Sequence, residues 1–285
     1  MKTLVVGFDS AWTPTNAGAL VGAVVQTDGR VRALGPPRPA DFPAAEQAIQ
    51  AWRDAEGVDA TLILLDQPTI VPNETGQRPV ENIVAGPVSR RFGGVQPANR
   101  GRAEMFGDDA PVWPFLARFG GAAPLDGLRP GRRAAQVFET YPVLALIALR
   151  WTRPDERRAT GRLPKYNPER RKTFRLADWQ YVCTVAARFV SEVGLSELAE
   201  ELHRLGALER PRKRDQDGLD ACLCLVVGLH LALGRSGLAV GQAESGYIVV
   251  PYGDVLADEL TDRCVATRRD PEAWVRRFRL ETGAG

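Results

Sequence analysis

The chain has 285 residues, of which 44% are hydrophobic and 25% are charged, and its formal net charge at pH 7 is +2. These values are close to those of ordinary globular proteins, so they exclude a disordered or fibrous chain. The net charge identifies no partner, but basic residues concentrate in 150–172 and 210–214, where they form either an attractive surface for an anionic substrate or a merely solvated face.

The first part of the chain predicts four strands and one helix. Apolar runs at 4–9, 17–26 and 31–34, separated by turn signals, predict three antiparallel strands in a meander. Residues 42–56 have helical periodicity, and the run 61–66 is rich in Leu and predicts a fourth strand. A crossover helix between the meander and the fourth strand places that strand parallel to the first.

Residues 67–133 lack a strong pattern. Gly, Pro, Arg and Asn dominate this stretch, and only 80–92 and 112–119 show short helical periodicity. A stretch of this length without regular periodicity is usually either functional or mobile. We therefore expect a loop-rich insertion here.

Regular structure resumes with a strand at 134–140 and a helix at 143–151, which Pro142 opens. The basic segment 152–172 is expected to be a loop. Further helices are expected at 173–193 and 196–205.

The last predicted helix covers 215–234 and is apolar around nearly its whole circumference, which indicates burial on most sides, with Asp215 as the N-cap. A short edge strand at 247–251 is followed by polar sequence. We expect one domain over 1–285, with these parts: a core of 1–66 and 134–234, the insertion 67–133, and a C-terminal tail 245–285.

The cysteines and the apolar runs indicate where the protein resides. Cys222 and Cys224 lie in an apolar helical stretch without the spacing of a zinc site, so we expect free buried thiols rather than metal ligands or disulfides. The first apolar run is too short for a signal peptide, and no later run has the length of a membrane span. We expect a soluble cytoplasmic protein without a membrane partner.

Carboxylates stand where apolar runs end. Asp9, Asp66 and Glu139 each close a predicted strand, and Asp217 and Asp220 share one face at the mouth of the buried helix. Unbroken apolar strands are covered on both faces, so acids at their ends are costly to place unless a cation meets them. Oxygen ligands from several segments can converge on one Mg²⁺ or Mn²⁺.

Each acid also has a structural interpretation. Asp217 and Asp220 would complement the helix dipole, Asp9 would accept backbone hydrogen bonds from the following turn, and Asp66 would cap a turn. The combination favours a metal site, because several partly buried anions repel one another unless they are neutralised. For Glu139, a ligand and a turn residue remain equal alternatives.

The strings GFDSAW, LLDQP, FETYP, KYNP and the DxxDA of 217–221 resemble, in order and spacing, the family called domain of unknown function 429. That family is regarded as predicted nucleases of ribonuclease H-like fold. The resemblance spans 1 to about 234 and implies an α/β fold with a mixed sheet, an antiparallel three-stranded meander plus parallel strands, flanked by helices. It implies Asp9 as the first-strand acid and Asp66 as the fourth-strand acid.

The resemblance also makes Asp217 and Asp220 the helix acids, and Glu139 matches the acid of the family's E-x-x-P string. Thr140 and Tyr141 stand where a His often occurs in that string, which puts a His-assisted proton transfer in doubt.

The implied activity is a nuclease that uses two Mg²⁺ or Mn²⁺ ions to hydrolyse nucleic-acid phosphodiester bonds. Two ions about 4 Å apart activate a water on one side and stabilise the leaving oxygen on the other. In this interpretation Asp9 bridges both ions, Asp66 and Glu139 bind one, and Asp217 or Asp220 binds the other.

Nucleic acid is the implied partner, and its contacts are the weaker part of the hypothesis. Tyr166 or Trp12 would stack on a base. The phosphate backbone would be held by basic residues, although loop arginines are often only solvated; these are Arg90, Arg91, Arg100, Arg102, Lys165, Arg170 and Arg171.

Two other functions remain open. A phosphotransferase of the actin and sugar-kinase type also begins with an apolar strand, an Asp and a hairpin, but it needs a second phosphate hairpin, and none is expected after Gln67. The other alternative is a non-catalytic binding or scaffold protein in which the acids are structural.

Overall fold

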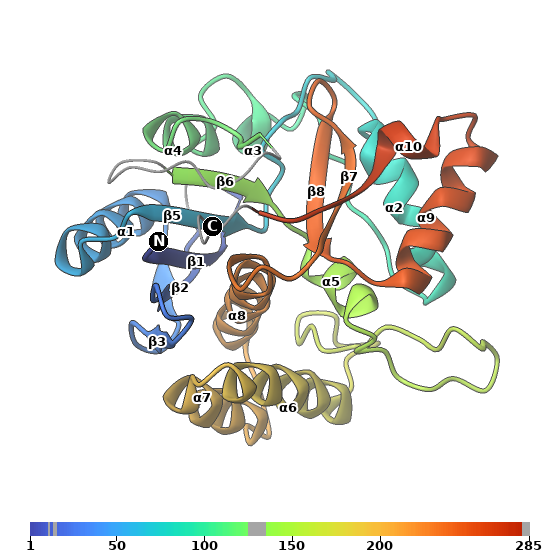
Figure 1. Ribbon diagram of the computed structural model, residues 1–285. Coiled ribbons are helices and arrows are strands. Elements are labelled where there is room, and N and C mark those ends of the chain that lie inside the picture. Colours follow the sequence, from blue (N-terminus) through green and yellow to red (C-terminus); the bar gives the residue numbers. More distant parts are fainter. Residues whose placement is uncertain (11, 14–15, 125–134, 281–285) are drawn as a thin grey trace.

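The computed structural model describes residues 1–10, 12–13, 16–124 and 135–280. A mixed sheet of six strands forms its centre (Figure 1). Its strands are β1 (Thr3–Asp9), β2 (Gly18–Val25), β3 (Val31–Ala33), β4 (Arg38–Ala40), β5 (Ala60–Leu65) and β6 (Ala135–Glu139).

Five strands of this sheet lie in the order β3-β2-β1-β5-β6, and β4 pairs with β2. β2 runs antiparallel to β1 and β3, whereas β5 runs parallel to both β1 and β6. The predicted meander and the predicted parallel fourth strand are therefore confirmed. The sequence pattern does not predict β4, because a three-residue strand containing Pro39 has no alternation to detect.

Helices cover both faces of this sheet, which explains the unbroken apolar strands. Leu4, Val6 and Phe8 of β1 pack on one face with α1 (Phe42–Glu56) and α4 (Val112–Arg118). The intervening side chains belong to the core on the other face, beneath α8 (Lys213–Ala232). Figure 1 shows α6 (Leu176–Glu192) and α7 (Ser196–Gly206) packed beyond α8 as an outer layer.

α8 approaches β1 closely because Gly7 has no side chain. A Cβ atom on Gly7 would lie 2.1 Å from the carbonyl oxygen of Ala221 and 2.4 Å from the amide nitrogen of Leu225. This contact brings the first turns of α8 against the end of β1, where Asp9 lies.

The helix α8 begins two residues earlier than predicted. Asp215 is the third helical residue rather than the N-cap, and its carboxylate accepts a hydrogen bond of 2.7 Å from the amide of Arg212. The acid caps the helix from inside its first turn, as in a capping box. The other helices before α8 are α2 (Pro79–Arg90), α3 (Ala103–Phe106) and α5 (Pro142–Ala148).

The sequence after α8 folds into regular structure, so the predicted polar tail is wrong. A second sheet has the strand order β8-β7-β9, and two helices connect β8 to β9 in the chain. The elements are β7 (Gly237–Gln242), β8 (Gly246–Pro251), α9 (Asp254–Ala266), α10 (Pro271–Trp274) and β9 (Val275–Phe278). Leu256, Leu260 and Cys264 are the buried apolar face of α9, which packs on α2. That face is narrow, so the segment's composition appears polar.

The hairpin of β7 and β8 also contradicts the expectation that no second hairpin follows Gln67. The last residue of its turn packs against protein, because a Cβ on Gly246 would lie 2.7 Å from Nη1 of Arg78 and 2.8 Å from the carbonyl oxygen of Ile70. In the described part of the chain, no helix is long and apolar enough to cross a membrane.

Gly7→Ala is expected to lower the free energy of unfolding by about 1 to 3 kcal/mol, because the added methyl group forces α8 away from β1. Urea unfolding measures the change. Gly218→Ala on α8 is the matched control: its Cβ would meet only Pro37 at 3.6 Å, and alanine favours a helix. Equal stability of Gly7→Ala and the wild type would contradict this account of the contact.

Candidate active site

Asp9 and Asp66 end neighbouring strands and face α8. Phe8 of β1 lies level with Leu65 of β5, and the amide of Asp66 donates a 2.9 Å hydrogen bond to the carbonyl of Phe8. Alternate residues of a strand share one face of the sheet, and Val5 of β1 belongs to the core on the face beneath α8. Asp9 and Asp66 therefore lie on this same face. The two carboxylates project from adjacent strand ends on the same side of the sheet.

α8 places its own acids against this pair. Asp217 and Asp220 lie in the first turns of the helix and are only 6% and 5% exposed. Both line the same cavity as Asp9 and Asp66, and the volume of this cavity is about 770 Å³. The structure thus brings four of the five predicted acids together at the end of the sheet, and Glu139 lines the same cavity.

Burial and repulsion by neighbouring acids raise the pKa values of Asp9, Asp66 and Asp220. Burial, followed by the charges of Asp66 and Asp220, raises the pKa of Asp9 well above its usual range. Burial and the charge of Asp220 do the same to the pKa of Asp66. Burial raises the pKa of Asp220 to about 6, although Tyr166 and Gln216 donate hydrogen bonds of 2.8 and 2.9 Å to its two oxygens. Three carboxyl groups therefore hold their protons more tightly than free carboxyl groups do.

Lys213 is a cation within this group that the sequence interpretation missed. Its ammonium group forms an ion pair with Asp217. Burial lowers the pKa of Lys213, but the bond to Asp217 and the charge of Asp9 together raise it above its usual value. The spacing of four residues between Lys213 and Asp217 could have predicted this ion pair, because residues four apart are neighbours on a helix. The prediction would have required a helix that begins before Asp215.

The donor set suits a divalent metal ion in kind and in charge. Carboxylate oxygens from separate segments are the ligands that Mg²⁺ and Mn²⁺ prefer, and Asp9, Asp66 and Asp220 carry more negative charge than Lys213 balances. As placed, no group of three or more His, Cys, Asp or Glu side chains among the described residues is arranged to hold an ion. Binding would therefore require side-chain movement toward a shared ion.

Glu139 lies in a different row of the sheet from Asp9 and Asp66. It is level with Leu65, whose side chain packs on the α1 face, whereas Thr140 follows at the level of Asp66 and donates its amide to the carbonyl of Leu65 at 2.9 Å. The Thr140 hydroxyl donates to the carbonyl of Val249. Adjacent residues of a strand point to opposite faces, so Glu139 leaves β6 on the face opposite to that of Asp66, although its charge still contributes to the raised pKa of Asp66.

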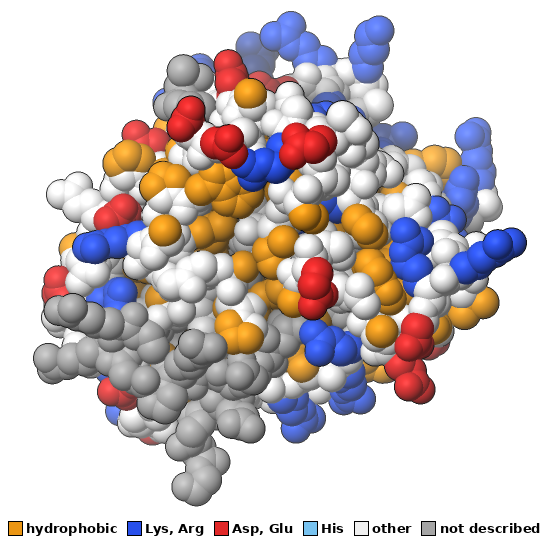
Figure 2. Space-filling model, turned by 90° about the horizontal axis from the view of Figure 1, so that it is seen from above, with side chains coloured by type: hydrophobic (Ala, Val, Ile, Leu, Met, Phe, Trp, Pro, Cys, Tyr) orange, Lys and Arg blue, Asp and Glu red, His pale blue; other side chains and the backbone are white. Residues whose placement is uncertain are grey.

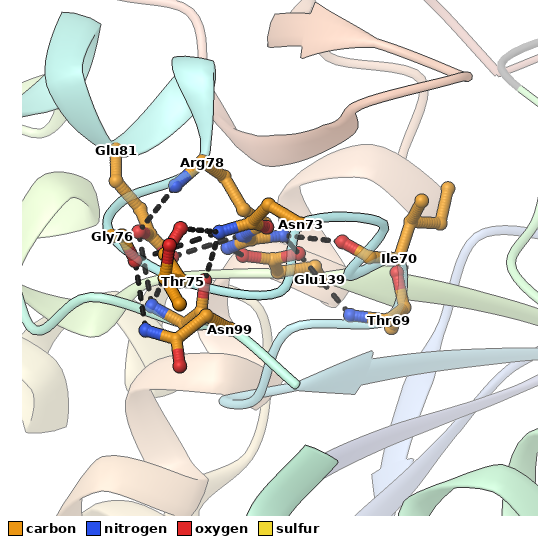
Figure 3. A network of polar contacts seen from close by, with 10 residues as sticks. Thr69, Ile70, Asn73, Thr75, Gly76, Arg78, Glu81, Asn99 and Glu139 are labelled. Carbon is orange, nitrogen blue, oxygen red and sulfur yellow. Dashed lines mark hydrogen bonds and ion pairs between the residues drawn. The ribbon is translucent and has the colours of Figure 1, made fainter. Parts of the chain in front are cut away.

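Arg78 receives the carboxylate of Glu139 in a buried network (Figure 3). Its Nη1 and Nη2 atoms donate to the two Glu139 oxygens at 2.8 and 2.6 Å, and its Nε donates to Glu81 at 2.9 Å. The arginine is 1% exposed; burial lowers its pKa, but Glu139 and Glu81 raise the pKa of Arg78 above its usual value. Both oxygens of Glu139 therefore already have a cationic partner.

The predicted substrate contacts divide into two groups. Lys165, Tyr166, Arg170 and Trp12 line the acidic cavity. The other predicted basic residues are not in its wall; these are Arg90, Arg91, Arg100, Arg102 and Arg171.

Arg91 and Tyr166 are too buried for the contacts expected of them. Arg91 is 2% exposed, and its guanidinium group donates to both oxygens of Glu259 at 2.7 and 2.8 Å, so a phosphate contact is excluded in this arrangement. Helical spacing from Val84 and Val88 could have placed Arg91 on the buried face of α2. Tyr166 is 6% exposed and binds Asp220 rather than offering a face for stacking.

The charges at the surface do not mark a binding site by themselves. On the face seen in Figure 2, Lys and Arg side chains alternate with acidic side chains, and hydrophobic side chains form small groups between them. This mixture agrees with the net charge of +2. The cavity, rather than a broad basic field on that face, therefore identifies the candidate site.

Comparison with known proteins gives one match. A family model with the description "Protein of unknown function (DUF429)" matches residues 7–245, which include all five acids. No curated protein and no solved structure matches the chain.

Asp9→Asn is expected to stabilise the metal-free protein at about pH 8 by about 1 kcal/mol or more, because it removes one of several repelling charges. Asp9 holds its proton more tightly in the native than in the unfolded state, so the wild type loses stability as the pH rises above about 4. Denaturant unfolding in EDTA across this range should show a gain that disappears in acid. Asp109→Asn, at an exposed position, is the control, and a destabilised Asp9→Asn at high pH would contradict the repulsion.

Arg78→Met is expected to destabilise the protein by about 3 to 5 kcal/mol, because it leaves two buried carboxylates without their partner. Adding Glu139→Gln should recover part of the loss, which denaturant unfolding measures. Arg204→Met removes an ion pair with Glu201 in which the arginine is 62% exposed, and it should cost less than about 1 kcal/mol. Similar losses for both arginine variants would refute the role assigned to the network.

Proposed function

This chain belongs to the DUF429 family, and we propose that it is a nuclease of ribonuclease H-like fold that depends on Mg²⁺ or Mn²⁺. One observation carries the proposal: Asp9, Asp66 and Asp220 line one cavity, and the pKa of each is raised by burial and by at least one neighbouring acid. Clusters of carboxyl groups with perturbed pKa values are typical of functional sites. The strand order β3-β2-β1-β5-β6, with acids at the ends of β1 and β5, supports the fold assignment.

The cavity residues have distinct roles in this proposal. Asp9, Asp66 and Asp220, together with Asp217, would hold the metal ions, whereas a ligand role for Glu139 would require it to leave Arg78. Bound divalent ions supply an activated water and stabilise the charge on a phosphate.

Neighbouring side chains orient the acids and bind the substrate. Tyr166 and Gln216 each donate to one oxygen of Asp220 and so fix the plane of its carboxylate. Lys165 and Arg170 lie in the cavity wall, where they would bind phosphates of the strand on either side of the cleaved bond.

A non-catalytic role is the second candidate, and Lys213 favours it. The ammonium group already pairs with Asp217 and offsets part of the rise in the pKa values of Asp9 and Asp66, so part of the acidic charge is balanced without a metal ion. A kinase-like role has less support, because the backbone at Gly246, where the turn of the second hairpin ends, packs on Arg78 and is not free to hold a phosphate.

We expect wild-type protein with Mg²⁺ or Mn²⁺ to cleave at least one of four labelled substrates, namely single-stranded, duplex, hybrid and branched nucleic acid. Asp9→Asn and Asp220→Asn should reduce cleavage to background, whereas Asp109→Asn should retain it. In parallel, Mn²⁺ should raise the melting temperature of the wild type but not that of Asp9→Asn, because an ion that binds the native state stabilises it. Absence of both cleavage and a thermal shift would reject the nuclease and favour the non-catalytic role.

A further inference from the structure

Phe92 is a large aromatic side chain that the fold leaves exposed in the wall of the acidic cavity. It lies two residues beyond the end of α2, lines the cavity and is 42% exposed. Single exposed apolar side chains are common on protein surfaces. The ring of Phe92 differs from these because its backbone and its charged neighbours are also unusual.

The backbone of Phe92 has a left-handed conformation with φ of 59°. This conformation ends α2, because a residue in the left-handed region directly after the C-cap is a common way for a helix to terminate. Here the amide of Phe92 donates to the carbonyl of Ser89 at 3.0 Å, and the amide of Gly93 donates to the carbonyl of Val88 at 2.9 Å. The Lys165 ammonium group donates to the carbonyl of Phe92.

The preceding residue anchors the same turn from the opposite side. Arg91 is buried, and its two hydrogen bonds to Glu259 fix it to α9. The main chain is thus held on both sides of Phe92, while the ring is directed outward. The ring of Phe92 is therefore held at a fixed place in the cavity wall.

The surroundings of the ring suit a ligand that combines a flat aromatic group with negative charge. The guanidinium group of Arg158 lies over one face of the Phe92 ring, with its carbon 4.5 Å from the centroid, so a base would stack on the part of the ring that stays exposed. Lys165 and Arg170 line the same cavity. Nucleobases stack on aromatic rings, and the phosphates that connect them bind basic side chains.

We propose that Phe92 is a stacking platform for an unpaired base of the substrate, so that the substrate near the cleaved bond is single-stranded or contains an unpaired base. This inference rests on the proposed nuclease function. Inside a duplex both faces of a base are covered by its neighbours, and only a base that has left the stack can offer a face to Phe92. Lys165 and Arg170 then hold the flanking phosphates.

The test is binding without cleavage. Fluorescence anisotropy in EDTA at low salt compares labelled single-stranded DNA, single-stranded RNA and a blunt duplex. Phe92→Asn removes the ring and keeps a residue that tolerates the left-handed backbone. Phe92→Trp keeps an aromatic face. Val265→Ala is the matched control, because Val265 is 64% exposed on α9 and lies outside the cavity wall.

Phe92→Asn should weaken single-strand binding about tenfold, as expected for the loss of one stacked base, with little change for the duplex. Phe92→Trp and Val265→Ala should bind single strands as the wild type does. The inference is overturned if the wild type binds no single strand, if Phe92→Asn binds as the wild type does or weakens both forms equally, or if Phe92→Trp is as weak as Phe92→Asn.

The two proposals fail separately. Metal-dependent cleavage by the wild type, combined with unchanged strand binding by Phe92→Asn, rejects the platform and leaves the nuclease. Strand binding that depends on the ring, without cleavage in Mg²⁺ or Mn²⁺, rejects the nuclease and leaves Phe92 as a platform for unpaired bases.

Discussion

The close approach of α8 to β1 is the constraint on which the candidate site depends. Because Gly7 carries no side chain, the backbone of α8 at Ala221 packs directly on the strand. The same contact brings Asp220 toward Asp9 in a buried place; burial raises the pKa values of both acids, and the charge of Asp220 raises that of Asp9 further. The packing of α8 on β1 is favourable for the apolar core, but it also places two carboxylates close together where the strand ends.

The two groups of buried acids differ in how far cations of the protein balance their charge. Glu139 and Glu81 share Arg78, which is itself buried and hydrogen bonded, so their charges are balanced within the protein. Among the described residues, Lys213 is the cation whose charge opposes the rise in the pKa values of Asp9, Asp66 and Asp220. A network needed only for stability would favour the first arrangement, since incompletely balanced buried charge is destabilising. Within the part of the chain that the structure describes, the first group is thus balanced by a buried arginine, whereas the second is balanced only in part by Lys213.

The sequence predicted the elements that have strong periodicity. Each of these elements has a single regular pattern of apolar side chains along its whole length and a single degree of burial. They are the unbroken apolar strands, the helix 42–56 and the buried α8. The acids at the ends of β1 and β5 were correctly placed together by the parallel pairing. The direction of Glu139 was not predictable, because it depends on whether the last residue of β6 is level with Leu65 or with Asp66. Arg78 and Lys213 were missed because their partners are visible only once the insertion and the helix start are placed.

The acids at the floor of the cavity and the wall near Phe92 come from different parts of the chain. This difference explains why the sequence predicted the acids but not the wall. The acids of the floor come from β1, β5 and α8, which share one core. The wall near Phe92 belongs to the insertion after β5, and it is fixed by the contact of Arg91 with Glu259, 168 residues later in the chain. The turn of β7 and β8 encloses Arg78 in the same way. The C-terminal elements therefore act as the support that converts a loop-rich insertion into a defined cavity wall, and local sequence patterns cannot reveal a partner at that distance.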